Sequence, residues 1–393
     1  MNIGLVTAGG ITRTFRNWPE RRLGAALVER GHDVRALTLF DPSVPHLAER
    51  HVEIEGIRVE RIRPTVAELW RGLRSLGRVD VIHLHHLRND LALPTALYAR
   101  LRRIPLAFTL HGILHDPFVV ADRDRPLDQP LTPERVVRRA RDIPRAGMRT
   151  GWRSYRMHRA LYLADRVIAL SEHEREVVAS LGVARRRIAV LPQWVNAEPD
   201  AACELRRRPA ILFIGQFKYR KGFDLLLRAL PRVRQRFPAL GAYFVTQNPL
   251  HRDVFEALID EGGLRGACEL VGQVEEGRKW AMLRAADLYV LPTRYEGFGL
   301  PVFEAMAAGC PVVGTRVPVL TELLSHGQDA LLAAPEDPDS LAAAMIRVLG
   351  DADLRERLVA GGRRLVEQRY SPAAVVPRYE ALYHELRDGA PPH

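Results

Sequence analysis

The chain has 393 residues, of which 47% are hydrophobic and 27% charged, a globular composition that is long enough for two domains. No apolar run approaches the roughly 18 residues that a membrane-spanning helix needs, so we expect no such helix. Three scattered cysteines, Cys203, Cys268 and Cys310, exclude a disulfide framework, and the opening MNIGLVTAGG lacks the basic flank of a signal peptide. We therefore expect a cytoplasmic protein.

The formal net charge of +11 is concentrated in the first half of the chain. Residues 1–195 contain 33 arginines against 21 acidic residues, whereas the remainder has 25 basic against 26 acidic residues. Lysine occurs only three times, as Lys218, Lys221 and Lys279, all in the second half. This asymmetry indicates that the two halves face different partners, although a GC-rich genome explains the arginine preference equally well.

Short β-rich runs alternate with helical patterns in the first half, which predicts βαβ units and a parallel sheet. NIGLVT leads to a Gly-Gly turn and to a helix from Pro19 to near Gly31, as helix start and stop signals indicate. The next candidate strands are DVRALTLF, VDVIHLHH, PLAFTLHG and DRVIALS.

The periodicity stops over residues 196–209 and then restarts with AILFIGQF, GAYFVTQN, CELVGQV, DLYVLPT and PVVGT. We therefore expect an α/β protein with two facing Rossmann-like domains, residues 1–195 and 210–370, and a cleft between them. We expect the C-terminal helix within residues 371–393 to pack back on the first domain. Ligands of such sheets bind at the carboxyl ends of the strands.

The stretch YEGFGLPVFEAMAAGCPVV, residues 295–313, places two glutamates around an apolar link. Glu296 follows the strand DLYVLPT, and Glu304 lies early in the next helix. The glycines between them allow backbone to approach a ligand, and a helix N-terminus attracts phosphate. One carboxylate can accept hydrogen bonds from a ribose diol and the other from a sugar, so the pair predicts a nucleotide-sugar site. Taken singly, each glutamate has a simpler explanation: Glu304 could complement the helix dipole, and Glu296 could be a solvated surface residue.

The E-x7-E pattern followed by AMAAGCPVV resembles retaining glycosyltransferase family 4, whose GT-B fold has two facing Rossmann-like domains. GQFKYRKGFDLLLRAL resembles the phosphate-binding segment of that family, and TAGG, HLHH, TLHG and DRVIALSEHE match more loosely. The resemblance implies transfer of a sugar, without metal or other cofactor, from a UDP- or GDP-sugar to a hydroxyl acceptor. That acceptor could be a glycan, a lipid-linked or phosphorylated molecule, or a small molecule.

The resemblance also implies roles for individual residues. Glu304 would hold the ribose hydroxyls and Glu296 the transferred sugar, while Lys221 would neutralise diphosphate charge. An arginine usual in the family is replaced by Gln216, and Arg220 would supply the missing charge. The implied catalytic residues are His111, Lys221 and Glu296. The implied donor-binding residues are Gly9, Gly10, Gln216, Arg220, Lys221, Glu296, Gly297, Phe298, Gly299, Leu300 and Glu304, with backbone N–H groups of Phe298, Gly299 and Leu300 on the diphosphate.

Other functions fit the sequence less well. TAGGIT is not the G-x-G-x-x-G of a nicotinamide enzyme, and Asp-x-Asp, the mark of metal-dependent transferases, recurs at near-chance frequency. His83, His85 and His86 lack a clustered cysteine or carboxylate, so we expect no metal site. The remaining alternative is a non-enzymatic protein that binds nucleic acid or another anionic ligand through the basic first half. No RNA-binding motif or basic recognition helix supports nucleic acid.

An arginine-rich stretch, residues 134–159, lies between TLHG and DRVIALS. On a helix its spacing makes a positive stripe suited to a phosphorylated acceptor or an anionic bilayer, which would place the protein peripherally at the inner face of the membrane. A solvated helix face explains the charges equally well, and Pro144 and Gly147 interrupt any helix over the whole stretch. The stripe consists of Arg145, Arg149, Arg153 and Arg156, with Trp152 and Tyr155 beside it.

Overall fold

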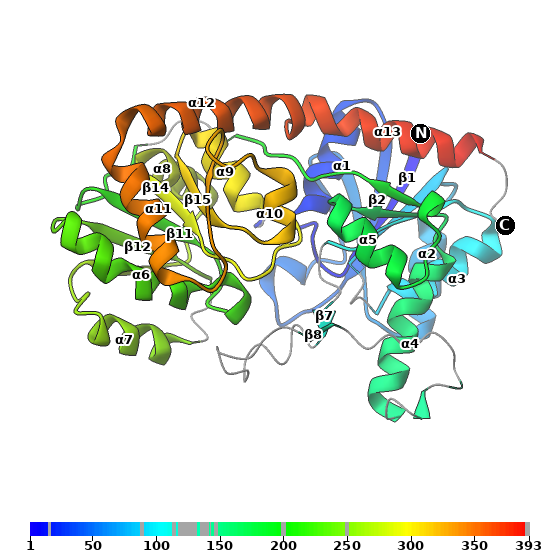
Figure 1. Ribbon diagram of the computed structural model, residues 1–393. Coiled ribbons are helices and arrows are strands. Elements are labelled where there is room, and N and C mark those ends of the chain that lie inside the picture. The colour runs from blue at the N-terminus through cyan, green and yellow to red at the C-terminus, as the bar shows by residue number, and fades with distance from the viewer. Residues whose placement is uncertain are drawn as a thin grey trace. The chain divides into compact units, whose positions relative to one another are not determined.

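The computed structural model describes residues 1–14, 17–86, 90–111, 115–116, 132–133, 141, 143–144, 148–197, 202–247 and 251–389. The chain forms two compact units. The first consists of Met1–Leu114, Glu134–Pro192 and Val375–His393, and the second of His115–Pro133 and Gln193–Ala374. Each unit is built on its own sheet, which is parallel in the second unit and parallel except for one edge pair in the first (Figure 1). The expected fold class, two Rossmann-like α/β domains, is therefore confirmed.

The first unit has an eight-stranded sheet in the order β10-β9-β6-β5-β1-β2-β4-β3. Every neighbouring pair is parallel except β3 with β4. The strands are β1 (Asn2–Val6), β2 (Asp33–Leu39), β3 (His51–Ile54), β4 (Ile57–Ile62), β5 (Val81–His85), β6 (Leu106–Thr109), β9 (Arg166–Ala169) and β10 (Ile188–Val190). The helices of this part of the chain are α1 (Pro19–Glu29), η1 (Pro45–Leu47), α2 (Val66–Ser75), α3 (Ala92–Arg102), α4 (Met148–Leu163), α5 (Glu172–Ser180) and η4 (Arg185–Arg187).

Helices α2 to α5 pack their apolar residues with those of the sheet into one core. Helix α13 (Pro372–Asp388) also belongs to this unit from Val375 onward. Its Glu380 forms ion pairs with Arg30 and His32, at 2.7 and 2.8 Å. The hydroxyl of Tyr383 lies 2.6 Å from Nδ1 of the buried His83. Polar contacts therefore tie this helix to β5 and to the loop between α1 and β2.

The hairpin of β3 and β4 is absent from the sequence prediction. Its turn is Glu55-Gly56, and both residues adopt positive φ, 52° and 76°, which a tight hairpin turn of this kind requires. The strands alternate apolar and polar residues, HVEI and IRVERI. That alternation was the available signal, but the turn carries glutamate instead of the asparagine or aspartate that usually precedes glycine.

The second unit has a six-stranded parallel sheet in the order β13-β12-β11-β14-β15-β16. This is the 3-2-1-4-5-6 order of a dinucleotide-binding fold, with its switch point between β11 and β14. The strands are β11 (Ala210–Ile214), β12 (Gly241–Val245), β13 (Cys268–Gly272), β14 (Leu288–Leu291), β15 (Val312–Thr315) and β16 (Leu331–Ala333). The helices are η5 (Tyr219–Lys221), α6 (Phe223–Arg236), α7 (Arg252–Glu261), α8 (Glu276–Ala285), α9 (Leu300–Ala308), α10 (Pro318–Leu323), α11 (Pro338–Gly350) and α12 (Ala352–Arg369). Two short strands, β7 (His115–Asp116) and β8 (Thr132–Pro133), form a separate antiparallel pair.

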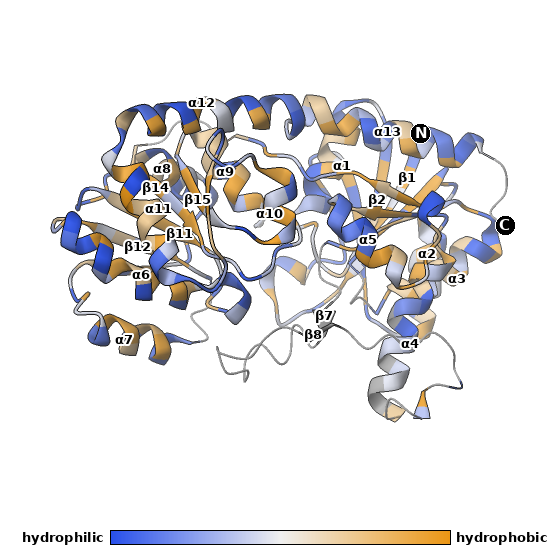
Figure 2. Ribbon diagram, in the orientation of Figure 1, coloured by the Kyte–Doolittle hydropathy of each residue, from blue (hydrophilic) through white to orange (hydrophobic). Residues whose placement is uncertain are grey.

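Apolar residues of α6, α7 and α11 pack with those of the strands into one core, and α8 and α9 pack against each other and the sheet. The strands β11, β14 and β15 are correspondingly hydrophobic, whereas hydrophilic residues dominate α12 (Figure 2). No helix within the described part of the chain is long and apolar enough to cross a membrane.

The strand order of the second sheet places two loops next to each other at the switch point, one after β11 and one after β14.

Candidate active site

The two loops at the switch point are in direct contact. Gly222, at the end of the first loop, has a φ of +66°, and a Cβ at this position would lie 1.8 Å from the carbonyl oxygen of Pro292. The amide of Arg294 donates to the carbonyl of Arg220 at 2.8 Å, and the Thr293 hydroxyl lies 2.7 Å from the same oxygen. Glycine is therefore required where the loops meet, because a side chain would push them apart.

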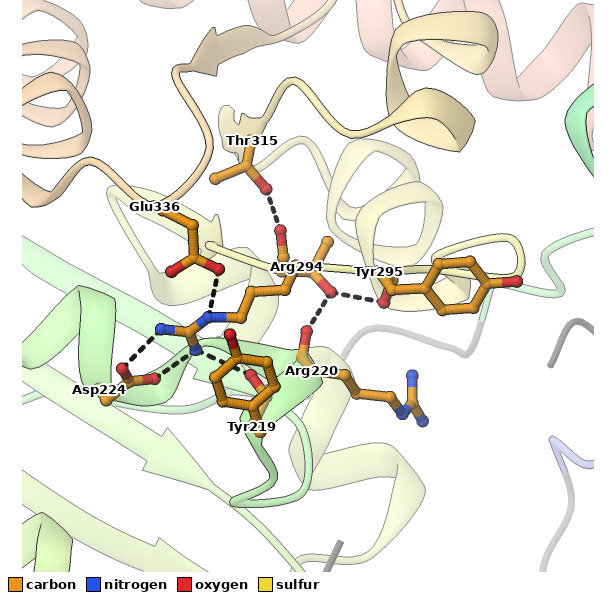
Figure 3. A network of polar contacts seen from close by, with 8 residues as sticks. Tyr219, Arg220, Asp224, Arg294, Tyr295, Thr315 and Glu336 are labelled. Carbon is orange, nitrogen blue, oxygen red and sulfur yellow. Dashed lines mark hydrogen bonds and ion pairs between the residues drawn. The ribbon is translucent and has the colours of Figure 1, made fainter. Parts of the chain in front are cut away.

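Arg294 fixes this arrangement with its guanidinium (Figure 3). It binds both carboxylate oxygens of Asp224, at 2.7 and 2.8 Å, and Oε1 of Glu336 at 2.6 Å. It also donates to the carbonyl of Tyr219 at 2.8 Å and lies over the Tyr219 ring, 4.2 Å from its centroid. Burial alone would lower the pKa of Arg294, but the two carboxylates outweigh it and raise the pKa. The planar guanidinium thereby joins the β14 loop to the η5 turn of the β11 loop and to the start of α6.

Glu296 lies in this structure as the motif predicts, just beyond β14, and only 5% of it is exposed. Lys221 Nζ contacts Glu296 Oε1, Arg220 lies 3.9 Å from Oε2, and the Thr293 hydroxyl lies 3.3 Å from Oε1. Burial alone would raise the pKa of Glu296, but Lys221 and Arg220 outweigh it and lower the pKa. Burial lowers the pKa of Lys221, against the opposing attraction of Glu296. The structure thus brings three of the predicted residues together.

Glu304 lies on α9, whose first residue is Leu300, so it is the fifth residue of the helix. It is 3% exposed, and its Oε1 lies 2.9 Å from Nζ of Lys279 on α8. The attraction of a helix dipole for a carboxylate fades beyond the first turn, so dipole compensation does not explain a buried glutamate here. The sequence analysis did not identify Lys279 as a site residue. The rarity of lysine was an available signal, because only three of the 58 basic residues are lysines.

The other predicted residues of this unit lie in the same two loops. Gly299 precedes α9 with a φ of +85°, which favours glycine. Phe298 turns its ring inward against Phe303 and Tyr370, at centroid distances of 4.8 and 5.5 Å, so it presents backbone rather than side chain to the loop surface. The first N–H groups of a helix have no partner within the helix and favour an anion. Gln216 follows β11, and Gly297 and Leu300 flank Phe298 and Gly299.

In the first unit, His111 follows β6 and joins a group of buried and half-buried polar side chains. His111 Nε2 lies 3.0 Å from Nδ1 of His85, and its ring centroid is 4.4 Å from that of His86. His86 in turn contacts the carboxylate of Glu20, which also accepts a hydrogen bond of 2.8 Å from Thr7. We call Glu20, His85, His86 and His111 the histidine cluster.

The histidine cluster has two unusual features, a strained backbone and shifted pKa values. His86 and His111 both adopt positive φ, 65° and 57°, at a cost of about 1–3 kcal/mol each, and such strain gathers at functional sites. Burial lowers the pKa of His111 to about 3, so this imidazole is neutral at pH 7. Burial alone would raise the pKa of Glu20, but His86 outweighs it and lowers the pKa to about 2.

Gly10 makes room for the cluster. A Cβ on Gly10 would lie 2.5 Å from the Glu20 carboxylate, whereas Gly9 has only Leu47 nearby, at 3.9 Å. The expectation that no carboxylate accompanies His83, His85 and His86 is wrong, because α1 places Glu20 in contact with His86, 66 residues away. Potential ligand atoms of Glu20, His85 and His111 lie within 4.8 Å of one another, a set that suits a divalent transition metal.

Within the described residues of the arginine-rich stretch, Met148 begins helix α4. Trp152 is 47% exposed, its ring lies 5.9 Å from that of Tyr155, and Met148 is 60% exposed. Arg156 is exposed and lies 3.6 Å from Asp90. Arg145 and the side chains of Arg149 and Arg153 lie outside what the structure describes. An exposed tryptophan and methionine therefore accompany at least one exposed arginine on this helix.

Family models match most of the chain. The model described as "Glycosyltransferase Family 4" matches residues 21–199, and "Glycosyl transferases group 1" matches residues 203–365. An uncharacterized glycosyltransferase, MJ1607 of Methanocaldococcus jannaschii, is 27% identical over 382 residues, which cover 89% of this chain and 88% of that protein. The phosphatidyl-myo-inositol mannosyltransferase of Mycobacterium tuberculosis is 36% identical over 187 residues, 46% of this chain and 48% of that protein.

Solved structures show the same fold. The sucrose-phosphate synthase of Thermosynechococcus elongatus has a TM-score of 0.74 at 22% identity and covers 99% of each chain. HepE of Anabaena, solved in complex with UDP, has a TM-score of 0.74 at 17% identity and covers 97% of this chain and 99% of that one. At these identities the likeness establishes the GT-B architecture.

Removing the guanidinium that joins the two loops should destabilise the second unit. Arg294→Ala leaves the buried carboxylate of Asp224 without its partner, a loss of about 3–5 kcal/mol for a buried pair. Arg232→Ala, which breaks an exposed pair with Asp339, should cost less than about 1 kcal/mol. Equilibrium unfolding in urea measures both variants. Equal stability losses in the two would contradict the structural role given to Arg294.

Proposed function

Because the chain belongs to the glycosyltransferases of family 4, we propose that it is a retaining, metal-independent enzyme that transfers a sugar from a UDP- or GDP-sugar to a hydroxyl acceptor. One observation carries the proposal. Glu296 and Glu304 are both buried, each in contact with a lysine, and both follow β14 at the switch point of a 3-2-1-4-5-6 sheet. Buried carboxylates with fixed partners are poised to accept hydrogen bonds from hydroxyl groups.

The charges around the two glutamates match the parts of a nucleotide sugar. Lys221, Arg220 and the start of α9 offer positive charge and N–H groups to a diphosphate. Glu296, beside these cations, accepts hydrogen bonds from the hydroxyl groups of the sugar. Glu304 accepts hydrogen bonds from the ribose diol. The UDP of the HepE complex supports a nucleotide in this fold.

Lys221 acts mainly in the transition state. As the bond between the anomeric carbon and the phosphate oxygen breaks, negative charge grows on the diphosphate, and a fixed cation stabilises it more than it stabilises the bound donor. The acceptor oxygen then bonds to the same face of the anomeric carbon, and its proton passes to the leaving phosphate oxygen. No protein base is needed. The neutral His111 can exchange hydrogen bonds with the acceptor without competing for that proton.

The rival reading of a non-enzymatic anion-binding protein is not favoured, because it gives no reason for two buried glutamates with dedicated lysines. The basic first half instead suits the acceptor. We propose that α4 contacts an anionic acceptor or bilayer through Trp152, Met148 and the arginines beside them. The similarity to a phosphatidyl-myo-inositol mannosyltransferase supports an acceptor at a lipid surface.

Loss of the ribose-binding carboxylate should weaken donor use. We expect Glu304→Ala to fold and to lose at least tenfold in kcat/KM for the sugar donor, since a hydrogen bond to a charged group contributes about 1.5–3 kcal/mol. Steady-state release of nucleoside diphosphate measures this. Glu356→Ala, an exposed glutamate on α12, serves as the matched control and should retain full activity. Unchanged kinetics in a well-folded Glu304→Ala protein would reject the ribose role.

Activity should survive chelation. Lys221, backbone N–H groups and the start of α9 serve the diphosphate, so EDTA should leave turnover within about twofold of its starting value. The assay compares the enzyme before and after dialysis against EDTA. Complete loss, restored by a divalent ion, would overturn the metal-independent mechanism and would make Glu20, His85 and His111 the first candidates for its ligands.

Membrane contact through α4 should depend on charge and salt. Sedimentation with phosphatidylglycerol vesicles should fall steeply as salt rises, because screening shortens the reach of surface charges. The triple variant Arg149→Glu, Arg153→Glu and Arg156→Glu should sediment less, while donor hydrolysis stays intact. Equal recovery with neutral and anionic vesicles at low salt would rule out an anionic bilayer and leave a soluble acidic acceptor.

A further inference from the structure

Lys279 lies outside the E-x7-E motif, and the motif gives no reason for a lysine at this position. It lies on α8, and its Nζ reaches across to α9, 2.9 Å from Oε1 of Glu304. The same ammonium contacts Glu276 one turn earlier on its own helix. The side chains of Lys279 and Glu304 are 13% and 4% exposed, so the pair is largely removed from water. A buried contact between two helices orders both side chains far more than a surface pair would.

The choice of lysine at this position is informative in a chain that uses arginine almost everywhere. Of the 58 basic residues only three are lysines, and two of these three contact the two glutamates of the motif. An ammonium is compact and can direct its three N–H groups to separate acceptors, whereas a guanidinium is planar and larger. Lysine therefore fits where one small cation must meet Glu276 and Glu304 without filling the space beside them.

The contact fixes the orientation of Glu304 and keeps Lys279 charged. Burial alone would lower the pKa of Lys279, but the carboxylates of Glu304 and Glu276 outweigh it and raise the pKa, so Lys279 is a cation at pH 7. A carboxylate offers about four lone-pair positions on two oxygens. One ammonium at Oε1 therefore leaves capacity for two hydroxyl donors, which is what a ribose diol supplies.

We propose that Lys279 is a positioning residue that holds the Glu304 carboxylate ready for the ribose diol and so sets the discrimination for ribose over ribose lacking its hydroxyls. The inference rests on the proposed function, since it requires a nucleotide in the second unit. Lys279 touches no substrate itself and acts through Glu304.

The test compares the affinities of a nucleoside diphosphate and its 2′,3′-dideoxy analogue by isothermal titration. UDP and GDP are both tried, and the tighter of the two is used with its analogue. Wild-type protein should prefer the ribose form by about tenfold or more, as expected for hydrogen bonds to a charged group. Lys279→Met should lower that preference to less than about threefold, while its affinity for the dideoxy analogue stays within about twofold of wild type.

Two further variants make the test specific. Arg278→Met removes an exposed charge from the neighbouring position of α8 and should leave the preference unchanged. Lys279→Gln keeps a polar side chain but not the charge, and it should lose the preference as Lys279→Met does. It also serves if the methionine variant does not fold.

The possible outcomes separate the inference from the proposed function. A preference that survives in both Lys279 variants would overturn the positioning role, as would a parallel loss of affinity for both nucleotides, which indicates general damage to the site. A wild-type protein that binds the nucleotide without preferring ribose would also overturn it, with the proposed function intact. A wild-type protein that binds neither UDP nor GDP would contradict the proposed function itself.

Discussion

Two buried carboxylates cannot remain charged within a folded domain without cations, and the second unit depends on how it meets that requirement. Glu296 has Lys221 and Arg220, and Glu304 has Lys279. Because leaving either carboxylate unpaired would be costly, the loop after β11, the loop after β14 and helix α8 must keep a fixed arrangement. Arg294 adds a second set of ionic contacts around the same loops. Stability and the proposed recognition of the nucleotide sugar therefore rest on the same residues.

The same requirement explains why the site lies at the switch point. Lys221 follows β11 and Glu296 follows β14, two strands that are neighbours in the sheet although 75 residues separate their side chains in sequence. The close contact of Gly222 with Pro292 brings the two loops within reach of each other. A phosphate placed there meets a cation, a helix N-terminus and a carboxylate-bearing turn together, which is the arrangement that a nucleotide sugar needs.

The sequence alone was enough to predict functional residues that lie close together along the chain. It did not reveal residues that only the folded structure brings into contact. The strands flanking the motif, the glycine turn and Glu296 and Glu304 follow from local pattern. Lys279 and Glu20 do not, because neither belongs to a motif and each meets its partner only through packing of a helix, 25 and 66 residues away. The hairpin of residues 51–62 was missed because its turn begins with glutamate. Rare residue types, such as lysine in this chain, are a signal that could have found Lys279.

Hydrogen–deuterium exchange in the presence of UDP or GDP tests the central claim most directly, because it locates the nucleotide without assuming any residue's role. Binding at the switch point should slow amide exchange over residues 215–222 and 296–305, the two loops and the start of α9, since bound diphosphate orders their N–H groups. Nucleotide binding that leaves exchange in both segments unchanged, with protection confined to other parts of the chain, would contradict the site described for this protein.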